Sequence, residues 1–413
     1  MNFLSDPINF IANWLGNLML GWGASQSLVT FILKFIGAGL VGVFGFSLVI
    51  FTIWLERKLY GRIQDRLGPN RVGPYGIFQT IPDIIKIFTK EYITPVGADK
   101  VAYNLAPILS VSAVLLIWAI LPFAKTIVGT DVNVGVLYVV AVGGIGALGI
   151  ILAGWSSNNK YSLLGAFRAV AQIVSYEVPM VLALLVPVLL GRTMGINSLV
   201  NAQSVWFVIM SPIAAFIFFT SSIAETGRAP FDLLEAESEL VAGYQTEYSG
   251  LKFGMFYVGE FLHAFTISAL TATLFLGGWR GPWAEQIPIL GVIWFFIKAF
   301  IVYFAVVLIR ISMPRLRIDQ MLNFNWKFLT PLALVLLILT ALVDKLFFVV
   351  LPGIPITETL IPWARAGVHL LINIIIILIT VQLLKTYRIK GVRVVGEPRP
   401  VAVAPEPPAS VIS

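Results

Sequence analysis

The chain has no cysteine and only two histidines among its 413 residues. The absence of cysteine excludes a disulfide, a thiolate-held iron–sulfur cluster and a cysteine nucleophile on this chain. Two histidines are also a poor basis for a multi-histidine metal site. We therefore expect no metal site here and no cofactor bound covalently or through metal ligands.

Charge is scarce as well: charged residues make up 12% of the chain, against 58% hydrophobic residues. The mean hydropathy of +0.90 and the long uncharged runs exclude an ordinary soluble domain. Because about 20 apolar residues span a bilayer as a helix, we predict an all-α polytopic membrane protein. About nine transmembrane helices can be placed, near residues 28–55, 102–123, 134–154, 168–190, 205–224, 253–277, 288–310, 328–351 and 362–384.

The domain organisation follows from this pattern. We expect residues 1–390 to form a single transmembrane domain without an internal repeat, and residues 391–413 to form a Pro-rich cytoplasmic tail. The tail lacks the apolar pattern of a packed core, so we expect it to be extended. The first ten residues lack the basic region of a signal peptide, so we expect no cleaved targeting segment.

The Lys and Arg residues that give the net charge of +7 lie mainly in the loops and the C-terminal segment. Alternate loops and the C-terminal segment together hold 21 Lys and Arg residues, whereas the intervening loops hold 5. Lys and Arg concentrate in cytoplasmic loops. We therefore expect an odd number of spans, with the N-terminus outside and the C-terminus in the cytoplasm, and no nucleic-acid partner.

The loop over residues 56–100 is too long and too patterned for a simple connector. After the turn-rich "GPNRVGP", apolar residues recur at helical spacing, at positions Ile77, Ile81, Ile84, Ile85 and Phe88. This spacing predicts a short amphipathic helix lying in the membrane surface. Its regular part should begin near Pro82, because proline is tolerated only in the first turn. The basic residues of the loop fit either topology with anionic-lipid contact or partner binding.

Four ionisable residues stand out inside predicted spans, where a charge is costly unless it is paired or neutralised. Glu177 lies in the fourth span, Glu260 in the sixth and Lys298 in the seventh, whereas Lys34 can snorkel to the outer surface. Each can serve as a structural polar bond between helices, and so can His263, three residues after Glu260. If the two acids and the lysine face one interior, they form a proton relay.

An acidic stretch, "AETGRAPFDLLEAESEL", covers residues 224–240 of this acid-poor chain. Spacings of three and four residues place its charged members on one face of a continuous helix; these are Glu225, Arg228, Asp232, Glu235 and Glu239, with Glu237 nearby. Pro230 interrupts such a helix, which leaves Asp232, Glu235 and Glu239 as the co-facial set.

Carboxylates this close share protons and titrate as a group. Interleaved apolar residues, Phe231, Leu233 and Leu234, indicate that the stretch packs against the protein. A solvated acidic face is the plain alternative. The stretch predicts either proton storage or an acidic funnel that faces a partner, and the residues alone do not separate these two.

Five blocks between about residues 50 and 330 carry a family resemblance. They are "ERKLYGRIQDRLGPNRVGPYG", "GWSSNNKYSLLGAFRAVAQIVSYE", "AETGRAPFDLLEAESELVAGYQTEYSG", "LFLGG" and "RISMPRLRIDQMLNFNWKFLTP". Together they closely resemble the H subunit of the proton-pumping NADH:quinone oxidoreductase, respiratory complex I, which is subunit 1 in mitochondria. The resemblance implies a subunit at the junction of the membrane and peripheral arms, with quinone as substrate and no redox cofactor of its own.

The resemblance also implies site residues by matching motifs, with no catalytic residue on this chain alone. The implied quinone-chamber residues are Glu56, Arg57, Arg62, Arg71, Glu225, Arg228 and Asp232. The implied proton-coupling residues are Glu177, Glu235, Glu237, Glu239, Glu260 and Lys298. The implied interface or supporting residues are Arg310, Arg315, Arg317 and Asp319.

The same resemblance implies partners: other subunits of both arms, quinone and the lipid bilayer of a bacterial inner membrane. This chain departs from the family pattern at Gly227, Pro82 and Ile318, and at His263, where the family has a small polar residue. The related membrane-bound hydrogenases and the ferredoxin- or F420-dependent dehydrogenases stay open, because this chain does not reveal the electron donor. A stand-alone ion transporter fits less well, because no inverted repeat is found, and a purely structural anchor leaves the buried charges unexplained.

Overall fold

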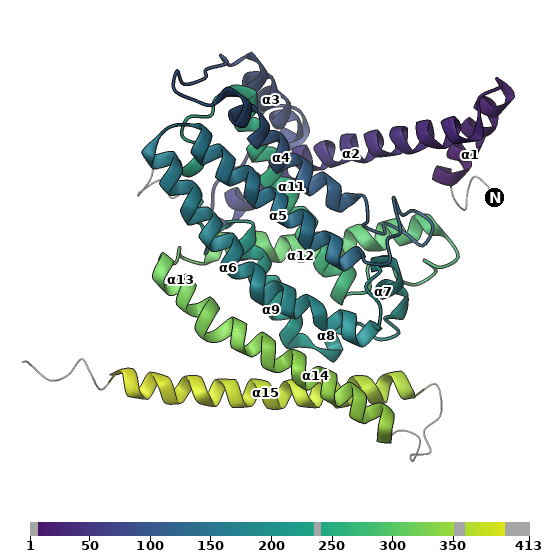
Figure 1. Ribbon diagram of the computed structural model, residues 1–413, viewed down its shortest axis with the longest axis vertical. Helices are drawn as coiled ribbons and strands as arrows, with labels where there is room; N and C mark the ends of the chain where they lie inside the picture. The colour runs from purple at the N-terminus through teal and green to yellow at the C-terminus, as the bar shows by residue number, and fades with distance from the viewer. Residues whose placement is uncertain (1–6, 235–240, 351–359, 393–413) are drawn as a thin grey trace, which may run out of the picture.

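The structure, a computed structural model, describes residues 7–234, 241–350 and 360–392. Within these ranges every named element of secondary structure is a helix, which confirms the predicted all-α fold (Figure 1). Eight helices of the described residues are long and apolar enough to cross a membrane. They are α2 (Gln26–Ile63), α4 (Lys100–Trp118), α5 (Gly135–Ser156), α6 (Lys160–Gly191), α11 (Gly250–Phe275), α12 (Pro288–Ser312), a run over Ile318–Val349 and α15 (Ile361–Val392).

The range 205–224, predicted as one span, is divided into α8 (Phe207–Met210) and α9 (Pro212–Glu225). The break falls at Ser211, directly before a proline at the first position of α9, which suits the start of a helix. The amide of Asn373, from α15, donates to the Met210 carbonyl at 3.1 Å and so satisfies a backbone acceptor at the break. The eight long helices and this shorter apolar one occupy the nine predicted ranges.

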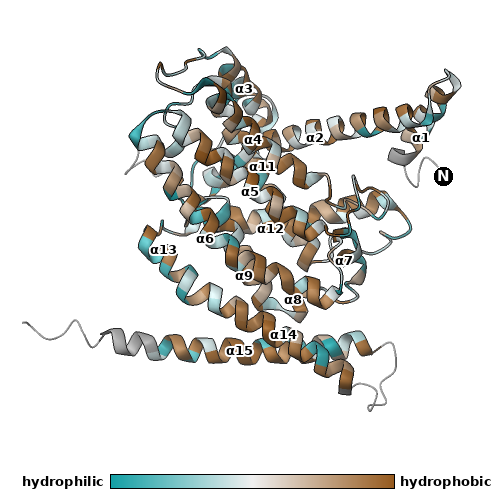
Figure 2. Ribbon diagram, viewed as in Figure 1, coloured by the Kyte–Doolittle hydropathy of each residue, from teal (hydrophilic) through white to brown (hydrophobic). Residues whose placement is uncertain are grey.

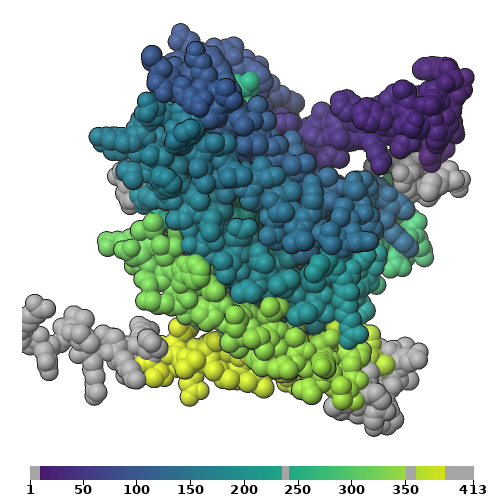
Figure 3. Space-filling model, viewed as in Figure 1, coloured from purple at the N-terminus to yellow at the C-terminus, as the bar shows by residue number. Residues whose placement is uncertain are grey.

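The remaining helical segments are short connectors and caps: α1 (Pro7–Gly21), η1 (Pro74–Gln79), α3 (Thr80–Thr89), α7 (Ile196–Ala202) and η2 (Gly243–Gln245). Helix α1 was not predicted from the sequence. It packs on the outer part of α2, and the two project away from the main bundle (Figures 1 and 3). The side chains on this part of α2 are apolar and largely exposed, as expected for contact with lipid or another subunit.

The run over Ile318–Val349 begins as α13 (Ile318–Phe324), passes through one π-helical turn, η3 (Asn325–Leu329), and continues as α14 (Thr330–Val350). The Asn325 amide donates to the Ser175 carbonyl of α6 at 2.5 Å. The Tyr176 hydroxyl donates to the Met321 carbonyl at 3.0 Å. These two bonds fix the irregular turn against α6, in keeping with the association of π-bulges with functional regions.

Helix α11 lies at the centre of the bundle, and nearly every side chain in its second half is buried. Its hydroxyl residues Thr266, Ser268, Thr271 and Thr273 donate back to carbonyls four residues earlier, so they add no unsatisfied polar group to the interior. Apolar residues cover most of the bundle's length, and polar residues gather at helix ends and loops (Figure 2). This distribution is the one expected of helices surrounded by lipid.

The predicted amphipathic helix after the first loop is confirmed as α3, and Pro82 lies in its first turn as expected. Ile87 packs against Gly254 of α11, where an added Cβ would lie 2.9 Å from the Ile87 side chain. Ile81, Ile85 and Phe88 are exposed. Helix α3 is therefore anchored on one face and presents an apolar stripe on the other.

Helix α15 is held to the bundle by a charged cluster that was not predicted. Asp344 of α14 accepts from the Arg365 Nε at 2.7 Å and from an Arg192 nitrogen at 3.3 Å. The His369 Nε2 lies 3.5 Å from the same Asp344 carboxylate, and the Arg365 guanidinium also donates to the Leu190 carbonyl. These contacts join the ends of α6, α14 and α15.

Candidate functional site

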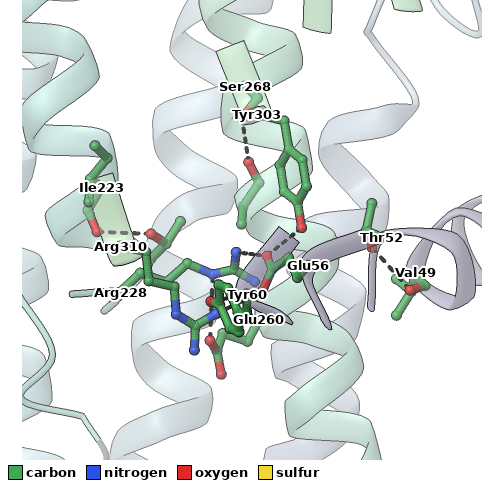
Figure 4. A network of polar contacts seen from close by, with 12 residues as sticks. Val49, Thr52, Glu56, Tyr60, Ile223, Arg228, Glu260, Ser268, Tyr303 and Arg310 are labelled. Carbon is green, nitrogen blue, oxygen red and sulfur yellow. Dashed lines mark hydrogen bonds and ion pairs between the residues drawn. The ribbon is translucent and has the colours of Figure 1, made fainter. Parts of the chain in front are cut away.

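Glu56 lies at the centre of the main buried polar network (Figure 4). It belongs to α2, is 2% exposed and forms an ion pair with Arg228. The Tyr303 hydroxyl donates to its Oε1 at 2.5 Å, and Arg310 donates to its Oε2 at 3.0 Å. The Tyr60 hydroxyl donates to the same Oε2 at 3.3 Å. A carboxylate that accepts from this many donors is fixed in position.

Arg228 reaches this network from the loop that follows α9, and its side chain is completely buried. Burial works against its charge, but the Glu56 carboxylate beside it outweighs this effect and raises the pKa of the guanidinium. Arg228 also lies over the Phe261 ring, 4.7 Å from its centroid. The network therefore draws together α2, α11, α12 and the acidic loop.

Three contacts fix the first half of the acidic loop against the bundle. The Gln172 amide of α6 donates to the Ala224 and Phe231 carbonyls, each at 2.6 Å. The Leu316 N–H donates to the Pro230 carbonyl at 2.9 Å. Phe231 and Leu233 are buried. The prediction that this stretch packs is confirmed for residues 226–234.

The helix interruption expected at Pro230 is found, but it begins earlier, because α9 ends at Glu225 and residues 226–234 follow without helix. The charged residues Arg228 and Asp232 reach the interior from this loop. Glu235, Glu237 and Glu239 lie outside the described residues. The co-facial set predicted with Asp232 therefore stays a prediction.

Glu260 of α11 connects the Glu56 network to a second group of acids. Its Oε1 lies 3.7 Å from the Arg228 Nε, and its side chain is 21% exposed. Asp232 is near enough to repel the Glu260 carboxylate electrostatically. Arg228 thus touches one carboxylate from α2 and another from α11.

Glu225, at the end of α9, lines the same cavity as Glu260. Its Oε1 is 3.8 Å from the His263 Nε2 of α11, and Glu177 of α6 is near enough to repel it electrostatically. A cavity of about 80 Å³ is lined by Glu225, Glu260 and His263 together with mostly small and apolar residues. By this measure one water molecule needs about 10–15 Å³, so the cavity has room for several.

Lys298 does not join these acids, which corrects the prediction of one relay containing two acids and this lysine. Its ammonium donates to the carbonyls of Leu276, Gly278 and Arg280, at 2.8, 3.0 and 2.7 Å. Leu276 is the C-cap of α11 and lies sixteen residues beyond Glu260, which is about 24 Å at 1.5 Å per residue. Lys298 therefore caps the C-terminus of α11, where a cation is favoured.

The first-loop arginines lie apart from the buried network. Arg57, Arg62 and Arg71 are exposed, although Glu56 is buried one residue earlier. Arg57 forms an ion pair with Asp83 of α3 at 2.5 Å. Of the residues predicted as interface or support, Arg310 contacts Glu56 in the buried network. Arg315 is half-buried, and Arg317 and Asp319 are exposed at the start of α13.

Sequence reasoning missed Tyr60 and Tyr303, the two hydroxyl donors to Glu56. Tyr60 follows Glu56 by four residues, so its place on the same helix face could have been inferred. Tyr303 lies 247 residues away in sequence from Glu56, and nothing in its local pattern distinguishes it from other apolar-face aromatics.

The arrangement is better suited to the movement of charge than to the making and breaking of covalent bonds. Its charged side chains come from α2, α6, α9, α11, α12 and the loop after α9. Glu225, Glu260 and His263 among them line a small cavity inside an apolar bundle. In such surroundings a change of charge on one group shifts the proton affinity of its neighbours strongly.

Comparison with known proteins gives the family. A model of the NADH dehydrogenase family matches residues 36–341. The H subunit of NADH-quinone oxidoreductase from Dehalococcoides mccartyi is 49% identical over 304 residues, covering 73% of this chain and 85% of that protein. Its namesake in a Geobacillus species is 44% identical, covering 77% and 96%. The namesake in Bacteroides thetaiotaomicron is 43% identical, covering 81% and 96%.

The matched residues include Glu56, Glu225, Arg228 and Glu260, whereas Asp344 and α15 lie beyond them. The motif blocks recognised in the sequence between about residues 50 and 330 fall within the same range. The extent of the match and the identity of the relatives agree, and the chain belongs to the NADH dehydrogenase family, together with the H subunits of bacterial NADH-quinone oxidoreductases.

Proposed function

We propose that this chain is the quinone-chamber and proton-coupling subunit of a complex I-type NADH:quinone oxidoreductase. The names of its relatives support membership of such an enzyme, in which it would assemble with other membrane-arm and peripheral-arm subunits. The observation that carries the coupling role is the buried network around Arg228, which contacts Glu56 and Glu260 from a loop.

The proposed quinone chamber uses the surface formed by the first loop and α3. Its exposed arginines, Arg57, Arg62 and Arg71, lie in the same segment as the exposed apolar stripe of α3. A quinone has a polar head and an apolar tail, so a wall with both kinds of side chain suits it. Neighbouring subunits complete the chamber, because this surface is open on the present chain.

The proposed coupling begins with the charge that appears when quinone takes up two electrons and two protons. That change would act on the loop carrying Arg228 and Asp232, with Glu235, Glu237 and Glu239 following along the chain. Arg228 would transmit it to Glu56 and Glu260. A unit charge at 4 Å is worth about 4 kcal/mol at an effective dielectric constant of about 20, or about three pKa units.

The cavity beside Glu260 extends this path toward Glu225 and Glu177. Because these acids come from three different helices, a change in their protonation can reach neighbouring membrane subunits without a large movement of the backbone. The proposed orientation places the acidic loop on the cytoplasmic side of a bacterial inner membrane, as the distribution of Lys and Arg indicates.

The test uses the assembled complex in native membranes. Glu260→Gln keeps the size of the side chain and removes its charge, whereas Glu285→Gln changes an exposed glutamate outside the network and serves as the control. We expect Glu260→Gln to lower NADH-driven quinone reduction and proton translocation together, at unchanged amounts of complex. Retention of both activities in Glu260→Gln would show that the network is only scaffold.

A further inference from the structure

His263 occupies a position between two acids that have no contact with each other among the described residues. Its Nε2 lies 3.8 Å from Glu225. Glu260 precedes it by three residues on α11, so the two side chains lie on neighbouring parts of one helix face. All three groups line the same cavity. His263 is therefore the one imidazole in contact with this cavity in the described chain.

Small residues of α5 leave the space for this cavity. Gly143, Gly146 and Ala147 line it, and a Cβ added at Gly143 would lie 3.7 Å from the Glu225 Oε1. The other wall contains Ser110 of α4 and Gly259 of α11, where an added Cβ would lie 3.2 Å from the Ser110 Oγ. Larger side chains at these positions would fill the space between the acids, so the packing keeps room for water there.

We propose that His263 carries protons between Glu225 and Glu260 across this cavity. The inference rests on the proposed function, because it requires that these acids exchange protons during turnover. Arg228 contacts the Glu260 carboxylate, and the same side chain lines the cavity, from which a proton can arrive. An imidazole is suited to this task because it can accept a proton at one nitrogen while releasing one from the other.

Each transfer balances without an electron or a co-reactant. The Glu225 carboxyl gives its proton to Nε2, which leaves a carboxylate and an imidazolium. The imidazolium then releases its other ring proton to cavity water, which gives a proton to the Glu260 carboxylate. The ring is neutral again, with its proton now on Nε2. It returns to its first tautomer when Nε2 releases this proton to cavity water and the other ring nitrogen takes one from cavity water. The charged groups that face the imidazole throughout are Glu225, Glu260 and Arg228.

The experiment uses the whole complex reconstituted in vesicles. His263→Gln keeps a polar side chain of similar size but cannot carry a proton, and His263→Ala opens space beside the cavity. Loss of a positioned proton carrier costs about 10²–10⁴-fold in rate. Because water can carry part of the protons, we expect the coupled rate, which is quinone reduction together with proton translocation, to fall about tenfold or more in both variants. Added imidazole should restore His263→Ala, whereas pyrazole, of the same size and much weaker basicity, should not.

A structural role for His263 predicts the opposite pattern. Wild-type coupled rates in His263→Gln, or equal rescue of His263→Ala by imidazole and pyrazole, would overturn the inference. If His263→Ala does not assemble, the rate of His263→Gln decides alone. The variant Glu225→Gln distinguishes a failure of the histidine step from a failure of the proposed function. An inactive Glu225→Gln with a normal His263→Gln refutes the histidine step only, whereas full activity in both Glu225→Gln and Glu260→Gln refutes the proposed function.

Discussion

The carboxylate of Glu56 in α2 and the guanidinium of Arg228 form a buried ion pair across 172 residues of sequence. The pair joins a transmembrane helix to the loop that carries the acidic stretch. Arg310 and Tyr303, both from α12, also donate to Glu56. These contacts therefore join the loop to α2 and α12.

Removal of one partner of this pair should be more damaging than removal of an exposed pair. Glu56→Ala leaves Arg228 charged and buried, which costs about 3–5 kcal/mol. We expect a strong loss of assembled complex from the membrane, measured by blue-native electrophoresis. Arg57→Ala breaks the Arg57–Asp83 pair at the surface and should cost about 1 kcal/mol or less. Equal amounts of complex in the two variants would contradict this account of the pair.

Tyr303→Phe removes only the hydroxyl that donates to Glu56 at 2.5 Å. A hydrogen bond to a charged group contributes about 1.5–3 kcal/mol, and Arg228, Arg310 and Tyr60 still serve the carboxylate. We expect a lower melting temperature for the complex with assembly preserved, measured by differential scanning fluorimetry. Tyr138→Phe removes a hydroxyl that donates to the Leu116 carbonyl at an exposed site and is the control. The prediction fails if both variants melt alike.

A substitution of Lys298 tests whether this lysine lies outside the proton path. Because its ammonium satisfies one carbonyl at the end of α11 and two in the loop that follows, Lys298→Met should lower stability by roughly 2–3 kcal/mol. In the complex that does assemble, the number of protons moved per NADH oxidised should equal that of the wild type. A lower proton-to-electron ratio at normal assembly would return Lys298 to the proton path.

The cluster around Asp344 should determine how firmly α15 is attached. Asp344→Asn removes the negative charge that holds Arg192, Arg365 and His369. We expect faster protease cleavage between α14 and α15 in detergent, with quinone reduction kept, because the cluster lies outside the family-matched residues. The neighbouring Lys345→Gln serves as the control. Unchanged cleavage in Asp344→Asn would show that apolar packing alone holds α15.

The sequence was sufficient for the helices because lipid imposes a simple rule on them. A run of about 20 apolar residues in lipid forms a transmembrane helix. The helical spacing of apolar residues up to Phe88 predicted the amphipathic helix α3 just as directly. The break at Ser211 was not predicted, since Asn373, far along the chain, satisfies the backbone there. Helix α1 was missed because its fifteen residues are short for a span.

The sequence identified several residues of the candidate site, but it did not predict which of them are in contact. Glu56, Arg228 and Glu260 were identified by motif, and their charges in an apolar chain marked them. Which of them meet depends on contacts between distant helices, and Tyr303 carries no local signal for its role. Lys298 shows the limit most clearly, because a lysine inside a span has the same sequence pattern whether it carries protons or caps a helix.

The central claim is that carboxyl groups in this interior change protonation when quinone is reduced. The most direct measurement is the infrared difference spectrum of the assembled complex on quinone reduction, in the region of the protonated carboxyl stretch. We expect a carboxyl band that disappears in Glu225→Gln or Glu260→Gln and persists in the exposed control Glu285→Gln. A spectrum identical in all three variants and the wild type would contradict the account.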